Sequence, residues 1–151
     1  MDRIHIPESI LGQIHIQAIQ DYPTECCGMI LGPKDTNELT RFRACENAQD
    51  NYHALDPKTF PRTAKTAYFI EPKELLRIEK ELSANNERIG VIYHSHIDVG
   101  AYFSEEDVRR AVADDAPIYP GTAYLVLSVV DGEIKGEKTF YWDPTNRSFV
   151  E

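Results

Sequence analysis

Two histidines, His94 and His96, flank a single serine directly after the apolar run Ile89–Tyr93. The run predicts a buried strand, and side chains two positions apart on a strand point to the same face. Two neutral imidazoles on one face can bind a metal ion such as zinc. A third ligand must come from elsewhere, and Asp107, expected in the first turn of the next helix, is the best candidate. Two histidines, one carboxylate and an open position are typical of a catalytic zinc site.

The spacing of these residues resembles the signature of the JAMM (MPN+) metallopeptidases: His-Ser-His, seven residues, Ser104, two residues and Asp107. The pattern is specific because three residue types and two spacings must agree, and the resemblance covers nearly the whole chain. The family also has a glutamate near its first strand, which Glu25 in Pro-Thr-Glu-Cys-Cys-Gly matches. The sequence departs from the family at Ile97, which stands where the second histidine is usually followed by proline.

The resemblance implies an α/β fold of the MPN (JAMM, cytidine-deaminase-like) class, a mixed β-sheet flanked by helices, as one domain over residues 1–151. It also implies one Zn²⁺ per chain, held by His94, His96 and Asp107. Zinc makes a water molecule more acidic, but a carboxylate must still take the proton and pass it to the leaving nitrogen. The resemblance gives that catalytic role to Glu25, and it gives Ser104 the role of stabilising the oxyanion.

Each of the catalytic candidates also has a purely structural interpretation. Ser-x-x-Asp at the start of a helix is close to a capping box, in which the serine accepts a backbone N–H and an acid lies in the first turn. The two interpretations of Ser104 and Asp107 are compatible, because the same serine can begin the helix and face the zinc site. Without the resemblance, Glu25 would be interpreted as an exposed residue at the start of a strand.

Other side chains that could do chemistry lack a supporting pattern. Cys26 and Cys27 could be a zinc ligand or a nucleophile, but a thiolate would fill the open position of the metal. The chain also lacks the His-x-Glu and Pro-Cys-x-x-Cys of nucleobase deaminases, so we expect buried, unreactive thiols. His53 lies in a long loop that could reach the site. Tyr102 and Phe103 either line a substrate groove or anchor their loop to the core.

Composition limits the classes of partner. The chain has 151 residues, a hydrophobic content of 42% and a net charge of -9, values that fit one globular domain. The negative charge argues against nucleic acid and against an anionic membrane surface as partners. The odd number of cysteines favours a reduced, cytoplasmic setting. The sequence has no signal-peptide pattern and no apolar run of ~18 residues, so neither export nor a membrane span is expected.

Apolar periodicity, proline and glycine predict the elements that must position these residues. We expect helices from Pro7 to about Tyr22, from Pro72 to Asn85 and from Ser104 to about Ala113, and a loop over Glu46–Ala67. We expect a hairpin turn at Asp131-Gly132 and strands over Cys26–Leu31, Glu38–Ala44, Tyr68–Ile70, Ile89–His96, Ala123–Val130, Ile134–Trp142 and Ser148–Val150, the last at an edge.

The resemblance to compact prokaryotic members of the family implies a zinc-dependent peptidase or isopeptidase. Its substrate would be an amide bond after the C-terminal Gly-Gly of a ubiquitin-like or sulfur-carrier protein. Two alternatives stay open. One is a zinc amidase acting on a small-molecule amino-acid conjugate. The other is a non-catalytic MPN scaffold, although such scaffolds typically lack metal ligands. No pattern in the sequence identifies the carrier, the leaving group or the oligomeric state.

Overall fold

The strand that carries both histidines, β3 (Glu87–Ile97), lies in the middle of a mixed sheet. In the computed structural model, which describes residues 3–151, β3 pairs antiparallel with β1 (Cys27–Pro33) and parallel with β6 (Ala123–Val130). Over these residues the sheet has six strands in the order β2-β1-β3-β6-β7-β8. The other strands are β2 (Arg41–Cys45) and β8 (Ser148–Val150) at the edges, and β7 (Glu133–Asp143) between β6 and β8.

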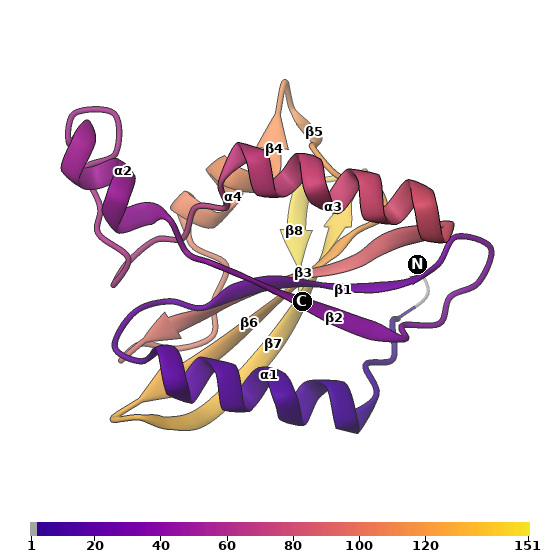
Figure 1. The fold of residues 1–151 in the computed structure, drawn as a ribbon, viewed down its shortest axis with the longest axis horizontal. Helices are drawn as coiled ribbons and strands as arrows, with labels where there is room; N and C mark the ends of the chain where they lie inside the picture. The colour runs from indigo at the N-terminus through magenta and orange to yellow at the C-terminus, as the bar shows by residue number, and fades with distance from the viewer. Residues whose placement is uncertain (1–2) are drawn as a thin grey trace.

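Helices cover both faces of this sheet, with α1 (Glu8–Asp21) below it and α3 (Pro72–Asn85) above it in Figure 1. The central strands are therefore buried on both faces, which explains why β6 is an almost continuous apolar run. His94 points to the α3 face, as does Ile92 two residues before it, and Ile92 packs in the same core as Ile78 of α3. The mixed sheet flanked by helices is the predicted fold class.

The predicted ends of these elements agree with the structure to within a few residues. Proline precedes α1 and begins α3, and α3 is followed by Asn86, which caps it in the left-handed conformation with φ 52°. Asp131 and Gly132 have φ values of 51° and 78°, which suit a two-residue hairpin turn between β6 and β7. The edge position of β8 is confirmed. Within the described residues, no helix has both the length and the apolarity to cross a membrane.

The prediction of a structureless loop over Glu46–Ala67 is wrong, because the segment contains α2 (Gln49–Leu55). Its one buried residue is the polar Gln49, so the sequence of this helix shows no apolar stripe from which it could be predicted. The strand predicted at Tyr68–Ile70 is also wrong. The backbone of Phe69 pairs with Ala48 (N···O 2.8 Å) and with the Asn47 side chain (3.1 Å), so it joins a loop and not a sheet.

The helix expected to reach Ala113 ends earlier, as α4 (Glu105–Ala111). Val112 is already extended, and the chain continues into a small hairpin formed by β4 (Val112–Ala113) and β5 (Ala116–Pro117). Asp114 and Asp115 at its turn have φ values of 52° and 60°. Aspartate tolerates this left-handed conformation better than most residues, but the two-residue strands were too short to predict from periodicity.

Candidate metal centre

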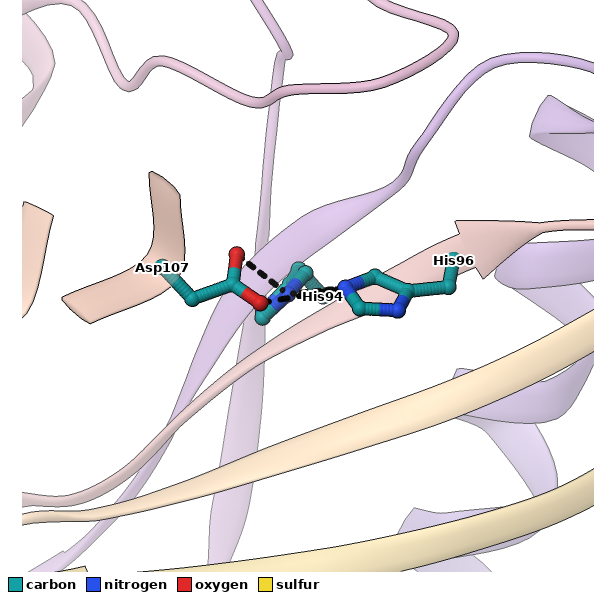
Figure 2. A group of neighbouring side chains, drawn as sticks. All are labelled: His94, His96 and Asp107. Atoms are coloured by element: carbon teal, nitrogen blue, oxygen red, sulfur yellow. Dashed lines mark hydrogen bonds and ion pairs between the residues drawn. The ribbon is translucent and has the colours of Figure 1, made fainter. Parts of the chain in front are cut away.

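Three donor atoms from β3 and α4 converge in the interior. His94 Nε2 lies 2.9 Å from Asp107 Oδ1, His96 Nε2 lies 3.1 Å from Asp107 Oδ2, and the two Nε2 atoms are 3.3 Å apart. Figure 2 shows both rings and the carboxylate pointing at one another. All three residues are buried. The group could hold a metal ion, and these are the residues that the sequence predicted as ligands.

The donor set fits a metal cation. His96 Nδ1 lies 3.0 Å from the Gly100 carbonyl oxygen, which can only accept, so Nδ1 carries a proton and Nε2 is the ring atom available to a metal ion. Nε2 and the Asp107 carboxylate are close enough for one cation to bind both. Metal bonds of ~2.0–2.2 Å in a tetrahedral zinc site separate donor atoms by roughly 3.3 Å, close to the spacings observed.

A capping box orients the Asp107 carboxylate at the start of α4. Ser104 N donates to Asp107 Oδ2 (2.9 Å), and Asp107 N donates to Ser104 Oγ (3.1 Å). Burial raises the pKa of Asp107, but the attraction of His94 and hydrogen bonds from both histidines and from Ser104 outweigh it and hold that pKa well below its usual range. The same contacts thus begin the helix and aim the carboxylate at the histidines.

Glu25 lies beside this group without joining it. Ser95 N donates to Cys26 O (3.1 Å), which extends the pairing of β1 with β3 and brings Glu25 next to the end of β3. Glu25 is 4% exposed, and its Oε1 has no hydrogen-bond partner among residues 3–151. Burial and the nearby Asp107 carboxylate raise the pKa of Glu25 to about 9. A buried carboxyl near the donor atoms, but not among them, can exchange a proton with a substrate there.

Segments from the 46–67 region hold the backbone of Glu25. Its N–H donates to Ala64 O (2.8 Å), and Asn47 Nδ2 donates to its carbonyl oxygen (2.9 Å).

Tyr68 stacks on the ring of His94 with centroids 4.6 Å apart and an interplanar angle of 26°. This contact could not be predicted from the sequence, because Tyr68 lies 26 residues before His94 and no local pattern signals the stacking.

The loop after β3 fixes the second histidine. Ile97 is the last residue of the strand and pairs with Val129, and Asp98 then turns the chain with a φ of 58°. The Asp98 carboxylate accepts hydrogen bonds from the Tyr22 hydroxyl (2.8 Å) and from Asp131 N (3.0 Å). Isoleucine in place of proline therefore continues the strand by one residue, and the anchored turn presents the Gly100 carbonyl to His96.

The remaining candidates divide into site and core. Tyr102 packs edge-on against His96 with centroids 4.9 Å apart and is 53% exposed, so it borders the site, whereas Phe103 is partly buried and packs against the core. His53 does not reach the donor group; it lies in α2, and its Nδ1 is 2.8 Å from Phe60 O in the segment that follows this helix.

The three cysteines are buried and free in the described part of the chain, as expected. Burial raises the pKa of Cys26 to about 12 and that of Cys45 to about 11. A thiol is nucleophilic as its thiolate, so these values disfavour reactivity.

Comparison with solved structures supports the fold. The solution structure of protein DSY2949 from Desulfitobacterium hafniense has a TM-score of 0.67 and 22% identity, covering 95% of this chain and 86% of that one. The solution structure of a Salinibacter ruber protein has a TM-score of 0.62, also at 22% identity, covering 95% of this chain and 85% of that one. At this identity the likeness concerns the fold alone.

Two relatives with named activities align with the chain. The CysO-cysteine peptidase of Mycobacterium tuberculosis (strain H37Rv) is 30% identical over 99 residues, 66% of this chain and 59% of the relative, so the chain spans less than two thirds of that protein. The desampylase of Haloferax volcanii is 30% identical over 122 residues, 80% of this chain and 74% of the relative. The family of prokaryotic homologs of the JAB domain matches residues 7–142, and the chain therefore belongs to the prokaryotic JAB family.

Proposed function

We propose that this chain is a zinc-dependent peptidase or isopeptidase that hydrolyses the amide bond after the Gly-Gly tail of a ubiquitin-like or sulfur-carrier protein. The observation that carries the proposal is the convergence of His94 Nε2, His96 Nε2 and Asp107 beside Glu25, whose buried Oε1 has no hydrogen-bond partner in the described part of the chain. A site built only for stability would also give the buried Glu25 carboxyl a hydrogen-bond partner. Residues 1–151 would act as one catalytic domain.

His94, His96 and Asp107 would hold the ion, about one per chain. The chemistry that zinc supplies when bound in such a site is polarisation of the scissile carbonyl and a lowered pKa for water. Glu25 would take a proton from the attacking water and deliver it to the leaving nitrogen. Its burial suits this task, because a raised pKa in the free protein lets the carboxyl carry a proton near neutral pH.

Ser104 would donate its hydroxyl hydrogen to the developing oxyanion. A serine hydroxyl offers one donor and two acceptor lone pairs. The capping box uses the oxygen as an acceptor from Asp107 N and leaves the hydroxyl hydrogen free. The helix cap and the oxyanion contact are therefore compatible at one side chain.

The names of the relatives support a carrier conjugate as substrate. One relative is named for a peptidase activity on CysO-cysteine and the other as a desampylase. A Gly-Gly tail would lie extended beside the metal centre, since glycine lets the backbone approach the ligands closely. The half-exposed Tyr102 next to His96 would form one wall of its path.

The test is to incubate the zinc-loaded protein with Gly-Gly-tailed carrier conjugates and to identify the products by mass spectrometry. We expect a single cut after the second glycine, and no cut by the Glu25→Gln variant. Cleavage of an isolated amino-acid amide together with an untouched carrier would instead indicate a small-molecule amidase. Absence of any cleavage by a fully metal-loaded preparation would indicate a non-catalytic scaffold.

A further inference from the structure

A group of arginines surrounds one buried carboxylate on α4, in a chain whose net charge is -9. Glu106 Oε2 lies 3.3 Å from Arg109 Nη2 and 3.9 Å from Arg62 Nε, and Glu106 Oε1 lies 3.4 Å from Arg110 Nε. Three guanidinium groups against one carboxylate leave a local excess of positive charge. Internal pairing with Glu106 therefore does not account for all three arginines.

These arginines line a cavity of about 200 Å³ between α4 and the loop that follows α2. Two buried atoms at the cavity make no hydrogen bond among residues 3–151: Arg110 Nε, whose 3.4 Å contact with Glu106 is an ion pair without hydrogen-bond geometry, and Oε1 of Gln49, a residue that is 1% exposed. Buried polar atoms are rarely left unpaired in folded proteins. The Arg110 donor and the local positive charge therefore favour an anionic ligand, whereas the Gln49 oxygen requires a donor group, which a carboxylate alone does not supply.

Two aromatic rings hold Arg110 in place before any ligand binds. Its guanidinium carbon lies 5.0 Å from the centre of the Phe69 ring and 5.9 Å from that of Phe60. Gln49 Nε2 donates to the Arg62 carbonyl (2.9 Å) and so fixes the opposite wall. A planar guanidinium that is already oriented loses little freedom when it binds a carboxylate through two parallel hydrogen bonds.

The cavity borders the candidate catalytic site. Glu106 is adjacent in the chain to Asp107, and Ala64, two residues after Arg62, accepts the hydrogen bond from Glu25 N. The charges of Arg62 and Glu106 both act on the pKa of Glu25, the first lowering it and the second raising it. Both segments that line the cavity therefore also carry or contact residues of the candidate site.

We propose that Arg110, assisted by Arg62 and Arg109, binds the free α-carboxylate of the leaving group. The inference rests on the proposed function and narrows its substrate: the group released after the Gly-Gly tail would be a single amino acid or a short peptide. The leaving nitrogen of an isopeptide belongs to a lysine side chain, whose own backbone carboxyl is an amide in a protein. A carboxylate site therefore selects peptide-linked conjugates over isopeptide-linked ones.

The test uses two conjugates of one carrier that end in Gly-Gly-Ala, one with a free terminal carboxylate and one with a terminal carboxamide. For the zinc-loaded parent protein, we expect the carboxamide to lower kcat/KM by about 10- to 100-fold, because a charge-assisted hydrogen-bonded pair is lost. Arg110→Met keeps the apolar contact with the phenylalanines and should cleave both conjugates at the same reduced rate. Arg77→Met, which removes the exposed partner of Glu74 on α3, should retain the preference.

A binding measurement separates recognition from turnover. Calorimetric titration of Glu25→Gln with the intact conjugates should give tighter binding of the carboxylate form, and this preference should vanish in Glu25→Gln/Arg110→Met. Arg110→Lys tests the same point should Arg110→Met unfold, since lysine keeps the charge but loses the bidentate geometry. It should retain only part of the preference, and a full preference would contradict bidentate binding.

The outcomes distinguish the two proposals. Equal rates on both conjugates with the parent protein would overturn the carboxylate site and leave the proposed function intact. If Arg110→Met instead lowered kcat/KM on both conjugates by the same factor, it would keep the parent's preference for the carboxylate. That result would mean that the arginine contacts an acidic group on the carrier body, which also contradicts the inference. Absence of cleavage of either conjugate would overturn the proposed function and this inference with it.

Discussion

Single hydrogen bonds determine which atoms of the metal centre are available. The Gly100 carbonyl fixes the proton of His96 on Nδ1, and the backbone of Ser104 fixes the rotation of the Asp107 carboxylate. His94 lacks such a polar partner for its Nδ1 among the described residues and is held by stacking on Tyr68. The three candidate ligands are thus oriented before an ion binds, which is the usual condition for a catalytic metal site.

Alanine at His94, His96 or Asp107 is expected to remove most of the bound zinc, since the two remaining ligands bind weakly. Glu25→Gln is the contrasting variant: we expect it to keep its zinc and to lose turnover by ~10²–10⁴-fold. Elemental analysis measures the metal, and mass spectrometry of the conjugate measures turnover. Loss of zinc in Glu25→Gln would show that this residue is a ligand and not a proton carrier.

Glu25 should also make the metal-free protein sensitive to pH. Its folded pKa is about 9, against 4.5 for an ordinary glutamate, so unfolding releases a proton between these values and stability falls as pH rises. Glu25→Gln removes this titration. In the presence of a chelator, the variant should gain stability over the parent by on the order of 1 kcal/mol near pH 8 and by little near pH 4.5.

Urea denaturation at several pH values measures this difference, with the exposed Glu105→Gln as control. Glu105 lies on the same turn of α4 as Asp107 but is solvated, so its variant should follow the parent at every pH. A gain for Glu25→Gln that does not grow with pH would contradict the shifted pKa.

The start of α4 combines a helix cap with a proposed oxyanion donor, and substitutions at Ser104 can separate these roles. Glycine is a fair N-cap that costs only a few tenths of a kcal/mol relative to serine, whereas it has no hydroxyl. We expect Ser104→Gly to keep stability and zinc but to lose kcat by ~10²-fold or more, and Ser104→Thr to retain most activity. Unchanged kcat in Ser104→Gly would leave this serine with a capping role alone.

The α2 region is expected to become more protected when a carrier binds. This segment contacts the Glu25 backbone and ends near the arginine cavity, and α2 projects from one end of the molecule (Figure 1), with Leu55 83% exposed. Hydrogen exchange on Glu25→Gln with and without conjugate measures the change, and α1, on the opposite face, is the internal control. Unchanged exchange across residues 46–67 would contradict a substrate-flanking role.

The elements that the sequence predicted correctly are those whose apolar residues repeat with a regular period or end at proline or glycine. β6 and α3 are of this kind. In contrast, α2 depends on contacts made after folding: Asp50 accepts from Ala64 N (2.7 Å), and the Tyr52 hydroxyl donates to Glu71 (2.7 Å). These partners lie 14 and 19 residues away in the chain, so no local pattern could reveal the helix.

The residues of the candidate site also differed in how well the sequence could predict them. His94, His96 and Asp107 could be predicted because they share one strand–loop–helix unit with fixed spacing. The proximity of Glu25 to this unit depends on the pairing of β1 with β3, which periodicity does not specify, so its assignment came from family resemblance. The Tyr68 stacking and the arginine cavity join distant segments, and nothing in the sequence pointed to them.

At the scale of the whole molecule, we expect the protein to discriminate strongly between carriers that differ in their C-terminal tail. Replacing the terminal glycine of a carrier with alanine should lower kcat/KM steeply, because a misplaced scissile carbonyl alone can lose ~10²-fold in rate. A short tail peptide should be cleaved more slowly than the folded carrier, since it lacks the carrier body. Parallel kinetics on the three substrates measures both effects, and equal rates on all three would contradict carrier processing while leaving the zinc chemistry in place.

The parallel pairing of β3 with β6 has a consequence for synthesis on the ribosome. The histidine strand gains its antiparallel neighbour β1 early, but its other edge stays open until residues 123–130 have been translated and folded back. Until then the nascent chain exposes an apolar strand edge, which favours association with other chains. A chain that is truncated before β6, by a stalled ribosome or a shortened message, should therefore aggregate. It should do so even though it already contains Glu25, both histidines and Asp107.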